Sequence, residues 1–251
     1  MSSERTLIVN ADDFGRSAGI NRGIIRAFEH GVVTSASLMV RWPFSSEAAE
    51  YAGGRPALSL GLHLDFGEWA YRDGDWAPVY EVVGIDDPHA IRREAHDQLA
   101  TFRRLVGAHP SHLDSHQHVH RREPIRSVLL EMARALDLPL RHECLVRYCG
   151  EFYGQDVDGS PLPANLTPEY FVSLLSQLPS GITELCCHPG EEEELDTMYC
   201  RERVQELRIL CDPQTRAAVI RLGIELSSFN SSRLTWGQGW RERNQYIRSA
   251  P

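Results

Sequence analysis

The sequence predicts an α/β protein in which a parallel sheet, open or closed into a barrel, is wrapped by helices. Strand-like and helix-like segments alternate about seven times, which is typical of repeated strand and helix units. A chain of 251 residues is ordinary for one α/β domain, and a hydrophobic fraction of 42% supports a sizeable core. No internal repeat interrupts the alternation. We therefore expect one domain over residues 1–229, followed by a polar tail over residues 230–251.

Short apolar runs mark the predicted strands. They lie at residues 6–10, 34–40, 57–64, 111–116, 138–142, 182–188 and 223–229. The first run leads directly into N-A-D-D-F-G, and the sixth leads into H-P-G. Pro189 stops the sixth strand and holds His188 in extended backbone geometry at its end.

Apolar residues at helical spacing mark the segments between the strands. These stripes run over residues 20–28, 44–51, 91–106, 125–136, 170–178, 204–211 and 217–222. Ser17 is available as the N-cap of the first helix, and Gly31 ends it. Thr167 and Pro168 form an N-cap followed by proline at the first helical position.

Two long connections, residues 65–88 and 143–166, show no clear periodicity, and connections of this length are usually functional. The first contains Trp69 and Trp76, and the second contains Arg147, Phe152 and Tyr153. Aromatic faces in such loops could stack on the apolar face of a sugar or form a small satellite core, and the sequence leaves both interpretations open.

Composition excludes several classes of partner. A formal net charge of −9 argues against a nucleic-acid or anionic-membrane surface, which needs clustered Lys and Arg, so we expect a neutral or cationic small-molecule ligand. No run of about eighteen apolar residues occurs, and the first residues are polar, so we expect no membrane span or signal peptide. Six cysteines without a C-x-x-C pair fit a reducing cytoplasm, with Cys186 and Cys187 in the core. A homodimer is left open.

The densest group of candidate site residues is S-H-L-D-S-H-Q-H-V-H at residues 111–120. Alternation along a short strand would place His112, Asp114 and His116 on one face. Neutral imidazole nitrogens are common ligands of zinc and its neighbours, and a nearby carboxylate can ligate or orient them. This pattern indicates a metal site. The alternative is a polar strand end whose histidines only form hydrogen bonds.

Ionisable side chains stand at the ends of five predicted strands. They are Asp12 and Asp13, His63, His116, Arg141 and His188. Working residues of parallel α/β folds gather at the C-terminal ends of the strands, so we expect these side chains at one rim. One carboxylate with two imidazoles leaves coordination positions for water and substrate, which is typical of a catalytic metal. A second carboxylate could take a proton and a histidine could protonate a leaving group, which indicates hydrolysis.

Four motifs together resemble those of the YdjC-like carbohydrate deacetylases. N-A-D-D-F-G at residues 10–15, G-L-H-L at 61–64, H-L-D-S-H-Q-H-V-H at 112–120 and C-H-P-G at 187–190 agree in order and spacing over nearly the whole chain. The resemblance implies an irregular single-domain (β/α) barrel of about seven strands with a metal site at its C-terminal rim. It also implies removal of acetyl groups from N-acetylated amino sugars or glycoconjugates, such as chito-oligosaccharides, hopanoid-linked glucosamine or aminoglycoside precursors.

Carried over by motif, the resemblance implies that Asp13, His63 and His116 hold one divalent metal ion. Asp12 would be the general base and His188 the general acid. Family members have been assigned magnesium or zinc. We prefer zinc, with magnesium as the alternative, because magnesium favours oxygen ligands.

The remaining residues and functions are assigned more coarsely. We expect His118 and His120 near the ion but not among its ligands, because the chain has left the strand by then. Substrate contacts are predicted from Arg141, Arg147, Trp69, Trp76, Phe152 and Tyr153. Two other functions stay open: a non-catalytic metal-containing sugar-binding or sensor protein, and a metal-dependent phosphoesterase. The presence of both proton-transfer residues favours an enzyme.

Overall fold

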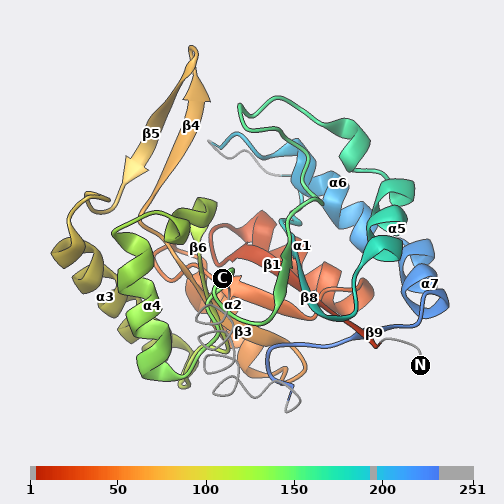
Figure 1. Ribbon diagram of the computed structural model, residues 1–251, viewed down its shortest axis with the longest axis horizontal. Coiled ribbons are helices and arrows are strands. Elements are labelled where there is room, and N and C mark those ends of the chain that lie inside the picture. Colours follow the sequence, from red (N-terminus) through yellow and green to blue (C-terminus); the bar gives the residue numbers. More distant parts are fainter. Residues whose placement is uncertain (1–3, 193–196, 232–251) are drawn as a thin grey trace, which may run out of the picture.

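Seven parallel strands form a curled sheet in the computed structural model, which describes residues 4–192 and 197–231 (Figure 1). The strands are β1 (Arg5–Phe14), β2 (Ser35–Leu38), β3 (Ser59–Leu64), β6 (Leu113–Ser115), β7 (Arg147–Cys149), β8 (Gly181–Cys187) and β9 (Ile224–Leu226). Their order is β6-β3-β2-β1-β8-β7, and β9 also pairs with β1. The predicted irregular (β/α) barrel with about seven strands is confirmed as a curled half-barrel in which β6 and β7 lie at the two ends of the strand order.

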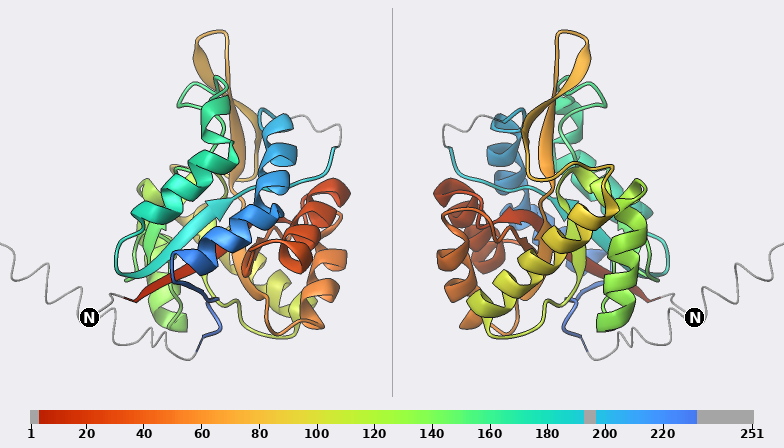
Figure 2. Two further views of the ribbon diagram at one scale, coloured as in Figure 1. Left: turned by 90° about the vertical axis from the view of Figure 1, so that its right-hand side faces the viewer. Right: turned by 90° about the vertical axis from the view of Figure 1, so that its left-hand side faces the viewer.

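Helices cover the outside of the curl (Figure 2). They are α1 (Ala18–His30), α2 (Ser45–Gly53), α3 (Pro88–Val106), α4 (Ile125–Leu136), α5 (Pro168–Gln177), α6 (Arg201–Leu210) and α7 (Pro213–Arg221), with short 3-10 helices η1 (His116–Arg121) and η2 (Pro163–Asn165). The Ser17 side chain accepts a hydrogen bond from Ile20 N, and that of Thr167 accepts one from Tyr170 N, so both predicted N-caps are confirmed. No helix of the described residues is long and apolar enough to cross a membrane.

Strand β1 lies at the centre of the sheet and separates an apolar face from a polar one. Leu7, Val9 and Ala11 belong to the main hydrophobic core, on the face that the helices cover. Alternation turns Asn10 and Asp12 to the other face, inside the curl, where both are buried. The polar interior of the half-barrel therefore begins at the strand that carries the two adjacent acids.

The long connection at residues 65–88 is not a loop. It contains an antiparallel hairpin of β4 (Gly67–Arg72) and β5 (Asp75–Glu81), which projects from the body of the molecule (Figures 1 and 2). The turn is Asp73-Gly74, and both residues have positive φ, at 54° and 90°. An Asp-Gly pair is the preferred sequence of such a two-residue hairpin turn, so a local signal was present although the hydrophobic periodicity was not.

The strand predicted over residues 138–142 is wrong. Only an isolated bridge forms there, between Leu140 and Leu113 of β6, and the backbone of His142 turns to a φ of 67°, which ends the extended run. The strand β7 lies instead at Arg147–Cys149, within the segment expected to be a loop. The predicted polar tail falls almost wholly outside the described residues, so the domain boundary at residue 229 stays a prediction.

Candidate active site

Asp12 and Asp13 lie near the C-terminal end of β1, and the side chains of the two residues point in different directions. Asp12 continues the alternation into the half-barrel, whereas Asp13 has a φ of 69°, a left-handed conformation that re-aims its carboxylate toward the rim. Both are almost fully buried. Each of two adjacent buried carboxylates needs a positive charge nearby to remain ionised. Arg141 supplies it to Asp12, and Arg203 supplies it to Asp13.

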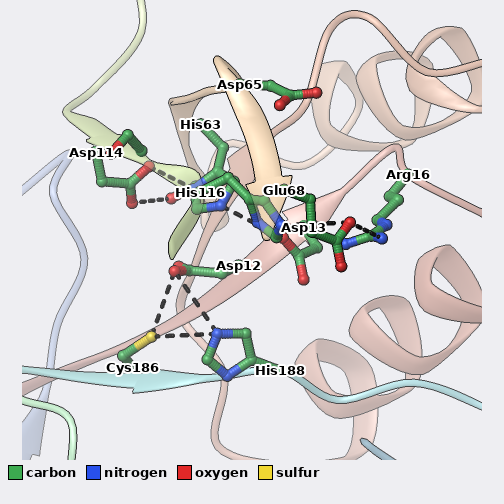
Figure 3. Close-up of polar contacts among 12 residues, drawn as sticks. Asp12, Asp13, Arg16, His63, Asp65, Glu68, Asp114, His116, Cys186 and His188 are labelled. Carbon is green, nitrogen blue, oxygen red and sulfur yellow. Dashed lines mark hydrogen bonds and ion pairs between the residues drawn. The ribbon is translucent and has the colours of Figure 1, made fainter. Parts of the chain in front are cut away.

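Asp13, His63 and His116 meet at the rim, as predicted. Asp13 Oδ1 lies 3.3 Å from His63 Nε2 and 3.0 Å from His116 Nδ1, and the two imidazole rings are 5.6 Å apart (Figure 3). Each residue offers a ligand atom within 4.8 Å of the others, so a divalent ion could be held between them. The other nitrogen of His63, Nδ1, lies 2.7 Å from Asp114 Oδ1. This is how a carboxylate orients a metal-binding imidazole, so the donor set fits a metal ion.

The surroundings of this group are strongly anionic. Burial opposes the charged imidazole of His63, but the Asp114 and Asp12 carboxylates outweigh it and raise the pKa of His63 to about 10. Burial likewise opposes ionisation of Asp13, but Arg203 and His116 outweigh it and hold the pKa of Asp13 well below its usual range. The carboxylates of Asp12, Asp13 and Asp114 therefore favour a positive charge at His63 and His116. A cation bound between these side chains would also supply a positive charge.

His116 lies one step away from its predicted place. β6 covers only Leu113–Ser115, and His116 is the first residue of η1. His112 and Asp114 do share a face, because both contact the Ser37 hydroxyl. The prediction that His116 shares this face is wrong, because the strand ends before His116. The His116 ring instead contacts Asp13.

Asp12 is fixed by Arg141 and by its neighbours inside the half-barrel. Arg141 Nη1 and Nη2 donate to Asp12 Oδ2 and Oδ1 at 2.7 and 2.8 Å, and Asn10 Nδ2 also donates to Oδ1 at 2.8 Å. Burial opposes ionisation of Asp12, but Arg141 outweighs it and holds the pKa of Asp12 well below its ordinary value. Asp12 is therefore an anion at neutral pH.

Arg141 is enclosed rather than exposed to a ligand. Its guanidinium also lies 2.8 Å from Asp114 Oδ2 and 2.6 Å from Glu184 Oε1, and its side chain is 1% exposed. It is absent from the cavity wall. This placement argues against the direct substrate contact predicted for Arg141 and makes it a residue that positions Asp12.

His188 follows the end of β8 and lies beside Asp12 at the wall of a cavity. Its Nε2 lies 4.0 Å from Asp12 Oδ2, and the Cys186 thiol lies beside both groups (Figure 3). Glu206 of α6, itself fully buried, accepts a hydrogen bond from the His188 backbone N–H and lies 3.8 Å from His188 Nδ1. A carboxylate partner for His188 is thus present, although the sequence did not identify it.

A cavity of about 810 Å³ opens above these groups. Trp69 and Trp76 of the hairpin line it together with Phe152 and Tyr153, so four of the six predicted substrate contacts lie at its wall. Arg147 does not line it and is exposed on β7. Cys186 is buried as expected, but its thiol also reaches the cavity wall.

Sequence reasoning missed several residues of the wall. They are Arg16, Glu68, Tyr148, Gln155, Met198, Tyr199 and Arg203. Arg16 pairs with Glu68 at 2.5 Å, and Glu68 Oε2 lies 3.8 Å from His116 Nε2. Arg203 Nη2 lies 2.5 Å from Asp13 Oδ2, the oxygen turned away from the histidines.

The fold and this rim define a class of protein, a parallel half-barrel with a carboxylate and two histidines at the C-terminal ends of its strands. The YdjC-like protein family model matches residues 6–221, and the chain belongs to that family. The chain is 34% identical over 247 residues to a carbohydrate deacetylase of Geobacillus stearothermophilus, covering 90% of this chain and 97% of the relative. It is 33% identical over 258 residues to a chitooligosaccharide deacetylase of Yersinia pestis (strain Pestoides F), covering 90% and 98%.

Two solved structures share the fold of this chain. A protein of Enterococcus faecalis V583, described as a "putative cellobiose-phosphate cleavage protein", superposes with a TM-score of 0.71 at 26% identity, over 90% of this chain and 98% of its own. A family 4 carbohydrate esterase of Streptomyces lividans, in complex with acetate, superposes with a TM-score of 0.54 at 12% identity, over 90% and 92%. The second likeness extends the fold to carbohydrate esterases.

Proposed function

We propose that this protein is a metal-dependent hydrolase that removes the N-acetyl group from an N-acetylated amino sugar or short oligosaccharide. The observation that carries the proposal is that Asp12 and His188, with Nε2 of His188 4.0 Å from Oδ2 of Asp12, line the same cavity as Asp13, His63 and His116. The deacetylase names of the two relatives support the same reaction.

Asp13, His63 and His116 would hold the ion, and two imidazoles among three protein ligands favour zinc over magnesium. When bound, such an ion acidifies a water molecule and polarises the carbonyl oxygen of the acetamide. Asp114 orients His63 through its Nδ1, and Arg203 occupies the second oxygen of Asp13. Only one carboxylate oxygen of Asp13 is then left to face the histidines and the ion.

Two side chains of the protein would move protons. Asp12, kept ionised by Arg141, accepts the proton of the attacking water. His188 donates a proton to the departing amine nitrogen, which is too basic to leave as an anion. Glu206 accepts a hydrogen bond from the backbone N–H of His188 and places a carboxylate oxygen 3.8 Å from its Nδ1, so it positions the ring beside Asp12.

The cavity suits a largely neutral, ring-shaped substrate. Trp69, Trp76, Phe152 and Tyr153 offer apolar faces against which sugar rings can stack. Two of the arginines in the wall, Arg16 and Arg203, are already paired with carboxylates. The six cysteines form no disulfide, which supports a reducing, cytoplasmic compartment as part of the proposal.

Acetate release from N-acetylglucosamine oligomers tests the proposal. We expect activity in the zinc-loaded protein, its loss on chelation, and a fall of about 10²-fold or more in Asp12→Asn. Asp97→Asn, the same chemical change at an exposed position on α3, should retain full activity. Absence of acetate release from any acetylated amino sugar with metal bound would refute the proposal. Hydrolysis of nitrophenyl phosphate instead would favour the phosphoesterase, and sugar binding without turnover the sensor.

A further inference from the structure

Three histidines gather beside the candidate active site without belonging to its metal-binding group. His118 and His120 lie in η1, and His142 ends the extended segment that bridges to β6 at Leu140. Their rings are 5.5 to 5.8 Å apart, and each offers a ligand atom within 4.8 Å of the others. The half-barrel thus brings together imidazoles from two separate segments of the chain.

Two ring nitrogens of this cluster are buried without a hydrogen-bond partner among the described residues. They are His118 Nδ1 and His120 Nε2, and the His120 residue as a whole is 1% exposed. Buried polar atoms of native proteins nearly always have a partner, so such atoms call for an explanation such as an ion. An ion between the three rings would satisfy both nitrogens at once.

The opposite nitrogens of the same two rings are held. His120 Nδ1 lies 2.8 Å from the Ser115 hydroxyl, and His118 Nε2 lies 2.9 Å from the Tyr148 hydroxyl. A metal-binding histidine usually has its second nitrogen held in this way, which fixes the ring and the tautomer. With His120 Nδ1–H donating to Ser115 Oγ, the lone pair of Nε2 is left for the ion.

The charge around the cluster does not exclude a cation. Two arginines act on the cluster. Arg121 is exposed to solvent, and the buried Arg141 is surrounded by the carboxylates of Asp12, Asp114 and Glu184, so its charge is more than balanced. His118 also lines the large cavity, which provides an entry path for an ion.

From this geometry we propose that His118, His120 and His142 form a second metal site, separate from Asp13, His63 and His116. Three nitrogen ligands and no carboxylate suit a late first-row divalent ion such as Zn²⁺, Cu²⁺ or Ni²⁺, and not Mg²⁺ or Ca²⁺. An ion there fixes His118, and through it the Tyr148 hydroxyl at the wall of the cavity. This site does not depend on the deacetylase proposal.

The number of bound ions tests the second site. The full-length protein is stripped with a chelator, equilibrated with Zn²⁺ by dialysis and analysed for zinc per chain. We expect His142→Asn to bind about one ion fewer than the wild type, because asparagine tolerates the positive φ of His142 but removes its imidazole. His63→Asn should lose a different ion, so the double variant should bind none. His96→Asn, at an exposed position on α3, should match the wild type.

Two further measurements separate loss of a ligand from loss of the fold. Near-ultraviolet circular dichroism of each variant should match the wild type, and His118→Asn, also at a positive φ, should repeat the loss of one ion. In the His63→Asn background, Co²⁺ should give visible absorption bands that His142→Asn abolishes. The second site is overturned if folded His142→Asn and His118→Asn bind as many ions as the wild type. A wild type that binds one ion, lost in His142→Asn and kept in His63→Asn, would support the second site and count against the proposed active-site metal.

Discussion

Replacing Arg141 by glutamine is expected to destabilise the protein strongly. The guanidinium lies 2.7 Å from Asp12 Oδ2, 2.8 Å from Asp114 Oδ2 and 2.6 Å from Glu184 Oε1, in a side chain that is 1% exposed. Removing one partner of a buried ion pair typically costs about 3–5 kcal/mol, because the remaining charges stay buried without compensation. For a chain of this length the loss corresponds to a fall in Tm on the order of 10 °C.

The loss of stability in Arg141→Gln should also depend on pH, and the pKa of Asp12 determines whether it grows or shrinks as pH rises. In the wild type, burial is outweighed by Arg141, and the pKa of Asp12 lies well below its ordinary value. This depressed pKa stabilises the fold above the unfolded pKa, about 4, and the contribution is lost as pH falls through the folded pKa. Without Arg141, burial dominates and the folded pKa rises. The variant then loses stability as pH rises above about 4, so its deficit should be greater near pH 8 than near pH 5.

Urea unfolding of the metal-free protein, followed by circular dichroism at both pH values, measures this deficit. Arg126→Gln is the matched control. Arg126 also binds a carboxylate, that of Glu143, at 2.7 Å, but its side chain is 40% exposed. An exposed pair is worth only about 0–1 kcal/mol. A deficit of Arg141→Gln below about 1 kcal/mol, or one of equal size at the two pH values, would refute the reasoning.

Three other variants test the interior and the chemistry. Burial raises the pKa of Glu184 from 4.5 to about 7. The folded protein therefore holds the Glu184 proton more tightly than the unfolded chain does, and the free energy of unfolding should fall by roughly 3 kcal/mol as pH rises from about 4.5 to about 7. Glu184→Gln should lack this pH-dependent change in the same urea series. Gly61→Ala places a Cβ 2.4 Å from the ring of His112 and should cost about 1–3 kcal/mol, whereas Gly53→Ala meets nothing within 4 Å and should be near neutral; equal costs would contradict this. His188→Ala should reduce acetate release by about 10²–10⁴-fold while elemental analysis still finds the metal bound, and loss of the metal would instead make His188 a ligand.

The rim could be predicted from the sequence because strand ends are local features. An apolar run followed by Asp12 and Asp13, or ending at His63 or His188, indicates both the strand and the place of its last side chain. Parallel strands bring those ends to one edge whatever the details of their packing. The meeting of Asp13 with His63 and His116 therefore followed from pattern and topology together, although His116 itself had already left its strand.

The groups that complete the site could not be predicted in this way. Arg203 and Glu206 come from α6, where charged residues in an amphipathic helix are normally assigned to the solvent face. Glu68 comes from a hairpin whose periodicity is weak. Their roles arise only when separate elements pack together, as when Arg203 of α6 contacts Asp13 of β1, 190 residues earlier in the chain. No local pattern reports such contacts.

The two adjacent acids are therefore best understood through their two arginines. Asp12 faces the half-barrel and binds Arg141, whereas the left-handed backbone of Asp13 turns it toward Arg203. Burial alone would raise the pKa of both carboxyls, and the separate arginines hold both pKa values well below the usual range. Both acids are then ionised without any help from a metal ion. Asp12, the proposed proton acceptor, and Asp13, the proposed metal ligand, are therefore already negatively charged before an ion binds. Binding of the ion need not first remove a proton from either carboxyl group.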